Sequence, residues 1–482
     1  MRTSHSLSRR GIAAAALAST ALALAPGPAG ATQLADALVG AYQTNPQLQA
    51  ERATLRATDE LVPQALSGYR PRVFLNGAVQ GTRGEIGNLK TSTSNRISGL
   101  ISGTGASGNG PQDGSQDANS TTRQVDLSLR QNLYAGGGTA ASVRRAESQV
   151  LSERANLLAT EQNVLLNAVD AYATAWQDRS VLELALNNEQ RLRRELEATR
   201  DRFRVGEVAR TDVAQAEASL SQSRADVETA KSDLATAVAV YRQVVGSDPG
   251  VLQQPRSVPD LPRTIQQAQD LAAGNPALTS AQYAVAAARE AVRVTYASLL
   301  PSVDLSSDLL YANQPSSQIP WERQASLGVS VTIPLYQQGL VASQVRQSRQ
   351  QVESTRNNLE TSQRGVTESV ASAWEQLIAA RAAIQSLRDA VRANEIALEG
   401  VRQEALVGAR TVLDVLDAEQ ALFTSQVNLV RAQRIEVVTS YQLKSAVGQL
   451  TVADLRLATQ AYDPGAYYRR NRDRLFGIDG GK

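Results

Sequence analysis

The feature that most restricts the fold of this chain is a helical stretch too long for a compact domain. Between Ala141 and Val205 there is no glycine or proline. At a rise of 1.5 Å per residue, a helix of this length would be roughly 100 Å long. A second stretch without glycine or proline follows from Ala209 to Val245. We therefore expect an elongated molecule built on long helices.

The first long stretch carries a narrow apolar stripe. Apolar residues recur at three- to four-residue multiples, at Val150, Leu157, Val164, Val169, Tyr172 and Trp176. A narrow stripe suits seams between helices rather than a thick core. Alanine, glutamine, asparagine and serine fill the other faces, as expected for helices that water contacts on two sides.

The chain also contains an internal duplication, which indicates a repeated structural unit. Asn-Pro at residues 45–46 recurs at 275–276, and Val-Gly at 205–206 recurs at 407–408. The first pair of motifs is 230 residues apart and the second pair 202, so the first copy holds a longer insert. Residues 85–121 are crowded with glycine, serine, threonine and asparagine. Such a composition predicts that this insert is a loop.

Each copy has the same predicted order of elements: a short helix, a helix of intermediate length, two strands, a very long helix, a tight turn and a second long helix. The copies span residues 32–248 and 264–451, joined by a proline-rich linker at 249–263 and followed by a tail at 452–482. We expect long helices at about 139–205, 209–245, 340–407 and 411–447, with Gly365 and Gly400 interrupting the third.

Alternating apolar residues predict four strands, at about 72–81, 124–133, 302–311 and 325–335. Aromatic residues near the strand ends fit a girdle at membrane interfaces; they are Tyr69, Tyr134, Tyr311, Trp321 and Tyr336. The same alternation also fits an ordinary half-buried sheet. Four strands are too few to close a membrane barrel, which needs about eight. If the strands cross a membrane, several chains must share the barrel.

The N-terminus has the pattern of a secretory signal. Arginines at positions 2, 9 and 10 precede an apolar run over 12–25, and Ala-Gly-Ala at 29–31 predicts cleavage after residue 31. The run is shorter than the ~20 residues of a spanning helix, which argues against an anchor. Removing 1–31 removes three of 49 basic residues and none of the 47 acidic ones, so the net charge becomes −1. This near neutrality disfavours nucleic acid as a partner.

The residue types exclude most catalytic chemistry. The only histidine, His5, lies in the signal, and the chain has no cysteine. Imidazole acid–base catalysis, thiol nucleophiles and zinc sites built from these residues are therefore excluded. We predict a protein that is not an enzyme and uses no cofactor or metal.

The segment from Val407 to Glu419, V-G-A-R-T-V-L-D-V-L-D-A-E, resembles the helix-turn-helix tip of the TolC family of outer-membrane channels. The segment V-G-E-V-A-R-T-D-V at 205–213 is similar to the family's first-copy tip. The resemblance, which includes the duplication and the order of elements, covers nearly all of the chain after residue 31.

The resemblance implies a mixed α/β membrane protein, a homotrimer with four strands per chain in a shared 12-stranded outer-membrane β-barrel. The barrel would continue into a long periplasmic α-helical barrel, in which the helices after residues 46 and 276 extend the shorter long helices. Such a channel is the exit duct of a tripartite export system for proteins or small molecules. Its partners are outer-membrane lipid, a periplasmic adaptor and an inner-membrane transporter.

The same resemblance implies a gate at the tip. Arg410 would hold the tip shut through links to Thr211 and Asp212 of the neighbouring tip segment. Asp414 and Asp417, three residues apart on one helical face, would give a trimer a ring of up to six carboxylates. The turns at Val205, Gly206, Val407 and Gly408 form the tip, with glycine at positive φ. The family often carries a gate-linking tyrosine where this chain has Ala405.

A plainer interpretation of the tip residues remains open. Thr411 with Asp414, and Asp212 with Gln215, fit capping boxes that only start helices. Arg410 would then be an ordinary surface arginine. For the whole chain, two other functions compete with a channel. A periplasmic adaptor usually has one helical hairpin rather than two, and a structural coiled-coil protein would not need alternating strands with aromatic ends.

Overall fold

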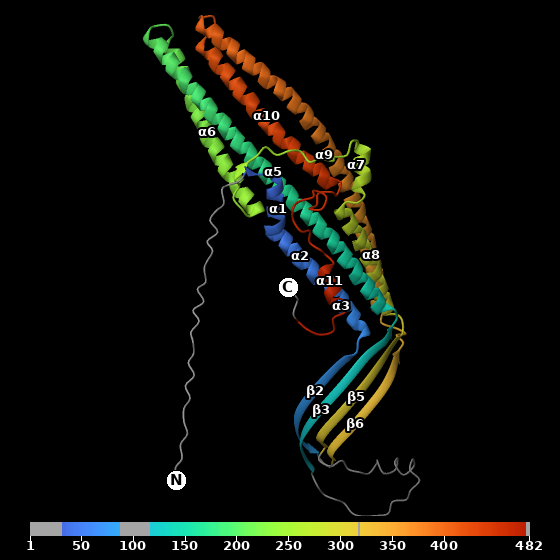
Figure 1. Ribbon diagram of the computed structural model, residues 1–482. Helices are drawn as coiled ribbons and strands as arrows, with labels where there is room; N and C mark the ends of the chain where they lie inside the picture. Colours follow the sequence, from blue (N-terminus) through green and yellow to red (C-terminus); the bar gives the residue numbers. More distant parts are fainter. Residues whose placement is uncertain (1–30, 87–115, 317–318, 479–482) are drawn as a thin grey trace, which may run out of the picture.

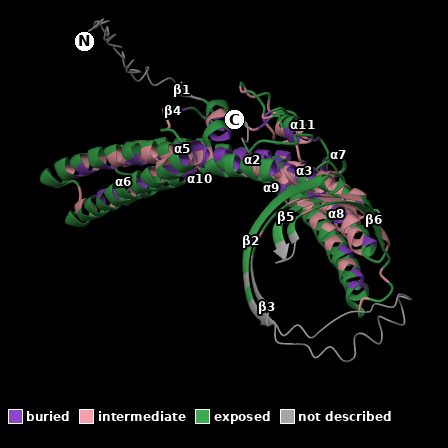
Figure 2. Ribbon diagram, turned by 90° about the horizontal axis from the view of Figure 1, so that it is seen from below, coloured by how far each residue is buried: buried purple, intermediate pink, exposed green. Residues whose placement is uncertain are grey.

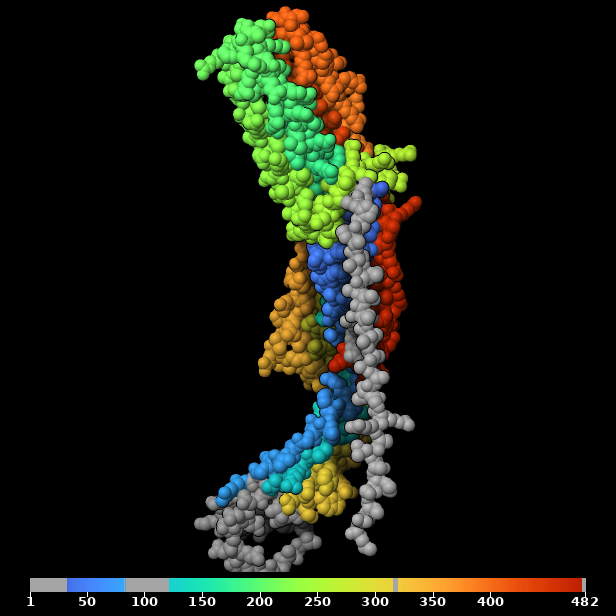
Figure 3. All heavy atoms as spheres, turned by 60° about the vertical axis from the view of Figure 1, so that its left-hand side comes forward, coloured from blue at the N-terminus to red at the C-terminus, as the bar shows by residue number. Residues whose placement is uncertain are grey.

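The computed structural model describes residues 31–86, 116–316 and 319–478. It is elongated, with a four-stranded sheet at one end and the tips of two helical hairpins at the other (Figures 1 and 3). The predicted signal, apart from Ala31, and most of the predicted loop insert lie outside the described residues. Burial is concentrated where the helices meet, whereas the strands are mostly exposed (Figure 2).

The four long helices form two antiparallel hairpins. Helices α5 (Gly138–Arg204) and α6 (Arg210–Val245) form the first, and α9 (Leu340–Leu406) and α10 (Val412–Ala446) form the second. Helices α5 and α9 have 67 residues each, which corresponds to about 100 Å. Gly365 and Gly400 do not interrupt α9, contrary to expectation; the helix simply continues through two positions with open space around them. Within the described residues, no helix combines the length and the hydrophobicity required to span a membrane.

The short helices differ between the copies. The first copy has α1 (Leu34–Thr44), α2 (Pro46–Asp59), α3 (Leu61–Leu66) and the 3-10 helix η1 (Ser67–Tyr69). The second has α7 (Ile265–Ala272) and an unbroken α8 (Pro276–Ala297). The break after Asp59 follows from Pro63, whose ring would clash with the carbonyl four residues earlier in a continuous helix. The second copy has Arg293 at the corresponding position.

Two asparagines join the helices end to end. Asn45 and Asn275 each cap the helix that they precede through the side-chain oxygen. The amide of Asn45 also donates to the carbonyl of Val244 at 3.1 Å, and that of Asn275 donates to the carbonyl of Ala446 at 2.9 Å. These bonds satisfy carbonyls that the ends of α6 and α10 leave free. Helix α2 therefore follows α6, and α8 follows α10, as the resemblance implied.

The sheet is antiparallel, with strand order β2-β3-β5-β6. Its strands are β2 (Arg72–Ile86), β3 (Gln116–Ala135), β5 (Ser302–Ser316) and β6 (Ile319–Thr332). They are longer than expected because the β2–β3 ladder continues into the insert, as far as Ile86 opposite Gln116. In the described chain no helix covers either face (Figure 1), so this is not a half-buried sheet.

The two faces of the sheet differ in chemistry. Residues directly opposite one another in the ladders share a face. One face is apolar and exposed, with Val73, Leu75, Val79, Val125, Leu127, Leu309, Leu327, Val329 and Val331. The other face is mainly polar, with Asn76, Gln80, Gln124, Asp126, Ser128, Arg130, Asp304, Ser306, Asp308, Gln324, Ser326 and Ser330. Such a sheet suits lipid on one side and water on the other.

The main core lies midway along the helices, where the linker and the tail pack on them. Tyr172, Tyr241 and Leu450 are fully buried there. The linker contains β4 (Val251–Leu252), which pairs in parallel with β1 (Ala31–Thr32). The sequence did not predict this pair. The C-terminal segment, including α11 (Ala466–Asn471), packs along α2 (Figure 1).

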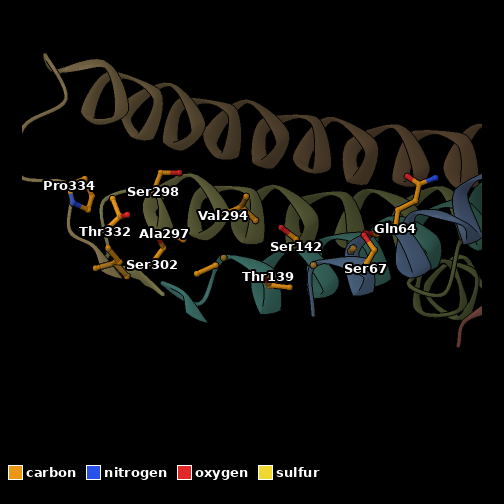
Figure 4. A pocket seen from close by; sticks show the side chains of 15 residues that line it. Gln64, Ser67, Thr139, Ser142, Val294, Ala297, Ser298, Ser302, Thr332 and Pro334 are labelled. Atoms are coloured by element: carbon orange, nitrogen blue, oxygen red, sulfur yellow. The ribbon is translucent and has the colours of Figure 1, made fainter. Parts of the chain in front are cut away.

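A cavity of about 600 Å³ lies where the strands meet the helices (Figure 4). Its lining consists of small, hydroxyl-bearing and apolar residues and the amide of Gln64, without a charged side chain; the hydroxyl-bearing residues are Ser67, Thr139, Ser142, Ser298, Ser302 and Thr332. Without charged side chains in its lining, this cavity offers no ionisable group for acid–base chemistry.

Candidate gate at the hairpin tips

The two hairpins end in the same turn. Gly206 has a φ of +85° and Gly408 a φ of +77°, conformations that side chains other than glycine rarely adopt. Behind each glycine, the next N–H donates back to the helix: Glu207 to Arg202 and Ala409 to Glu404, both at 2.9 Å. This is the Schellman arrangement that ends many helices. The glycine at each tip is thus explained by backbone geometry.

The predicted capping box of α10 is present. The carboxylate of Asp414 accepts the backbone N–H and the hydroxyl of Thr411 at 2.9 and 2.8 Å, and the N–H of Asp414 donates to that hydroxyl at 3.3 Å. These bonds, helped by the charge of Arg410, hold the pKa of Asp414 below its usual range.

The predicted box of α6 is different. Helix α6 begins at Arg210, so Asp212 is itself the third helical residue, and it accepts the N–H of Ala209 at 3.0 Å. The pairing of Asp212 with Gln215 is therefore wrong. Thr211 lies beside Asp212 in the same first turn.

Arg410 binds within its own hairpin. Its Nε donates to Glu404 at 2.9 Å, and its guanidinium lies 3.9 Å from Asp414. These partners differ from Thr211 and Asp212, to which the resemblance points. All of these groups are well exposed, so each pair contributes little to stability in isolation. Arg410 therefore supports the turn of the second hairpin.

The tips of the two hairpins are held together by an apolar seam. Val412 and Leu416 of α10 pack in one cluster with Leu192 and Leu196 of α5 and with Leu220 of α6. Asp417, by contrast, is exposed. The seam and the tip turns lie at the end of the molecule opposite to the sheet (Figure 1).

A buried ion cluster joins the hairpins just behind this seam. Glu419 of α10 is only 2% exposed. It accepts a hydrogen bond from Arg402 of α9, and its second oxygen lies 2.8 Å from the guanidinium of Arg191 on α5. Glu419 therefore links the two arms of its own hairpin and also the first hairpin to the second. The sequence reasoning did not assign it this role.

The first copy contains the corresponding ion pair, but there both side chains are exposed to solvent. Glu217 and Arg200, each 202 residues earlier than Glu419 and Arg402, form an ion pair at 2.6 Å. Their side chains are 49% and 54% exposed. The repeated Ala-Glu was the only sequence signal for this pair. The burial of Glu419 depends on the neighbouring helix α5, which supplies Arg191.

A further contact joins the two hairpins nearer to the middle of the molecule. Arg434 of α10 donates to Asp170 of α5 at 2.5 Å and to Thr174 at 3.2 Å. Helices α5 and α10 are thus joined by two arginine contacts, by the apolar seam at the tip and by the main core.

Comparisons with known proteins agree with this architecture. The profile of the family described as "Outer membrane efflux protein" matches residues 37–247 and 267–449, one stretch for each copy. The chain is 36% identical to the outer membrane efflux protein BepC of Brucella suis, over 92% of this chain and 91% of that protein. It is 27% identical to the outer membrane protein TolC of Escherichia coli, over 61% of this chain and 63% of that protein.

The fold is shared with solved structures. The structure of CusC superposes with a TM-score of 0.73 at 18% identity, covering 87% of this chain and 92% of that chain. That of the Campylobacter jejuni outer membrane channel CmeC superposes with a TM-score of 0.74 at 14% identity, covering 91% and 89%. The chain therefore belongs to the outer membrane efflux protein family, whose members are non-enzymatic outer-membrane channels that extend into the periplasm.

Proposed function

We propose that three copies of this chain assemble into one closed channel, which receives its cargo from an inner-membrane transporter through a periplasmic adaptor. The observation that carries this proposal is the open sheet. Strands β2 and β6 are its two edges. In lipid, each unpaired N–H or C=O group at such an edge costs roughly several kcal/mol.

Pairing between copies removes these edges. The polarity of the four strands alternates, so β6 of one copy can pair in antiparallel fashion with β2 of the next. Three copies of four strands give the 12-stranded barrel that the family resemblance suggests. The apolar face would then contact lipid, and the polar face would line a water-filled lumen.

The duplication supports a matching arrangement of helices. Within one chain α5 packs on α10. The corresponding helices of the other copy, α9 and α6, leave a similar pair of faces for adjacent chains. We infer that the two repeats, 32–248 and 264–451, alternate around the tunnel.

The gate belongs to this proposal. The tip turns, Thr211, Asp212 and Arg410 would meet between chains, and Asp414 and Asp417 would approach the tunnel axis. We infer that opening separates the two hairpins of a chain at the seam, so that the buried Glu419 cluster must break. Family members often have a gate-linking tyrosine at the position of Ala405. We infer that the Glu419 cluster provides a link between the hairpins where that tyrosine is absent.

The exposed apolar residues at the tips fit an adaptor. Val205 is 72% exposed and Val407 80%. Both stand on the turns that face away from the sheet. An apolar partner tip would bury them.

The test is purification of the chain from membranes, followed by mass measurement and planar-bilayer recording. We expect a trimer that inserts and conducts ions. An adaptor or a structural coiled-coil protein would give no channels, and a monomer in the membrane would contradict the proposal.

A further inference from the structure

Three arginines lie on the apolar face of the sheet, toward the end that is farthest from the helices. Arg83 is on β2, Arg123 on β3 and Arg323 on β6. The ladders place Arg123 opposite Val79, and Arg323 opposite Tyr311. All three are exposed. The β2–β3 ladder also places Glu85 and Asp117 on this face, two residues beyond Arg83, whereas Arg123 and Arg323 have Val79 and Tyr311 opposite them.

The position of Arg323 along β6 coincides with the expected edge of the membrane, and Arg123 lies two ladder positions farther from the helices. From Ile333, just beyond β6 on the helix side, to Arg323 there are ten residues. At ~3.3 Å per residue and a tilt of ~40°, these span about 25 Å in height, which is the usual apolar band of such barrels. Because the helices extend into the periplasm, the arginines lie at the outer leaflet.

Arg323 is already held in place by aromatic side chains. Its guanidinium carbon is 5.2 Å from the ring centre of Trp321 and 5.6 Å from that of Tyr311. Stacking restricts the side chain before any ligand arrives, which lowers the entropy cost of binding. Arg123 is on the strand two places away, about 10 Å across the sheet. This spacing suits a headgroup with two anionic groups.

We propose that Arg123 and Arg323 bind the phosphate groups of a phosphorylated glycolipid in the outer leaflet. A guanidinium offers a planar fork of donors that matches phosphate oxygens. The adjacent Val79, Leu309 and Leu327 provide an apolar surface for the acyl chains of the same lipid.

The experiment uses the full-length trimer in detergent, with bound lipid counted by native mass spectrometry. The probes are bisphosphorylated lipid A, the same lipid stripped of phosphate, and inorganic phosphate as a competitor. The variant is Arg123→Gln with Arg323→Gln. The matched control is Arg130→Gln, which changes an arginine of β3 on the polar face.

We expect the trimer to prefer bisphosphorylated lipid at least 10-fold over the stripped lipid, and the double variant to lose this preference while the control keeps it. If the double variant does not assemble, Arg123→Lys with Arg323→Lys should assemble and bind several-fold more weakly than the wild type. Equal binding of both lipids, an unchanged double variant, or displacement of the lipid by inorganic phosphate at equal concentration would overturn the site. The inference rests on the proposed barrel, so a wild-type chain that forms no trimer would refute that barrel instead.

Discussion

Replacing Glu419 by Gln should destabilise the closed tip. The carboxylate is 2% exposed, whereas Arg191 and Arg402 are 21% and 39% exposed. Breaking a fully buried pair costs about 3–5 kcal/mol; because both arginines reach solvent, we expect about 2–3 kcal/mol here. In the wild type, this energy favours the closed tip because the cluster breaks when the hairpins separate. Without it, the ratio of open to closed channels should rise about 30- to 150-fold in the variant.

The duplication provides the control. Glu217→Gln removes the same group at the corresponding position of the first copy, where the pair is about half exposed. Such a pair contributes about 1 kcal/mol or less. Two further variants separate the links of Glu419. Arg191→Gln breaks the contact between hairpins and should open the tip, whereas Arg402→Gln breaks only the contact within one hairpin.

The assay is single-channel recording in planar bilayers, together with the thermal stability of the trimer. We expect Glu419→Gln and Arg191→Gln to spend much longer in high-conductance states, with the trimer intact. If Glu419→Gln behaves like Glu217→Gln, the buried cluster does not contribute to closure.

Three other outcomes are expected. Asp59 is buried 3.9 Å from Arg154, and desolvation raises its pKa to about 6. The unfolded carboxyl titrates near 4, so protonation of Asp59 on acidification from pH 7 to 5 should stabilise the folded protein. Asp59→Asn should stabilise the protein at pH 7 by up to about 3 kcal/mol and reduce the pH dependence of its thermal unfolding. An unchanged pH profile would contradict the assignment. Replacing residues 87–115 by a short Gly/Ser link should leave trimers in the membrane fraction, and their loss would refute the loop. Asp414→Asn with Asp417→Asn should abolish block by multivalent cations from the periplasmic side, whereas unchanged block with weaker helices would identify Asp414 as a cap only.

The helical part of the fold could be predicted because its signals are local. A run without glycine or proline defines each helix of the first hairpin, the duplication repeats the arrangement in the second, and Val-Gly marks each tip where a positive φ is required. The Asn-Pro pairs mark where α2 and α8 begin, although their bonds to the preceding hairpins needed the structure. Even the break in the first copy is encoded, since Pro63 cannot continue α2.

Features that depend on distant neighbours could not be predicted. The two-residue pair of β1 and β4 has no periodic signal, because it is too short to alternate. The extra length of β2 and β3 runs through glycine, aspartate and asparagine, which are poor strand formers. Glu419 appeared only as a repeated Ala-Glu, because its burial requires Arg191 on a helix more than 200 residues away in sequence.

The most direct test of the channel is a cross-link between the two free edges of the sheet. The chain has no cysteine, so single cysteines can be placed on β2 at Ala78 and on β6 at Gln324, Ser326, Gly328 or Ser330 in turn. All of these positions are on the polar face. Oxidation in membranes should give covalent dimers and trimers with at least one of the four pairs. Monomers alone with every pair, although a control pair of cysteines introduced at Ala78 and Gln124 within one chain oxidises normally, would contradict a barrel shared between chains.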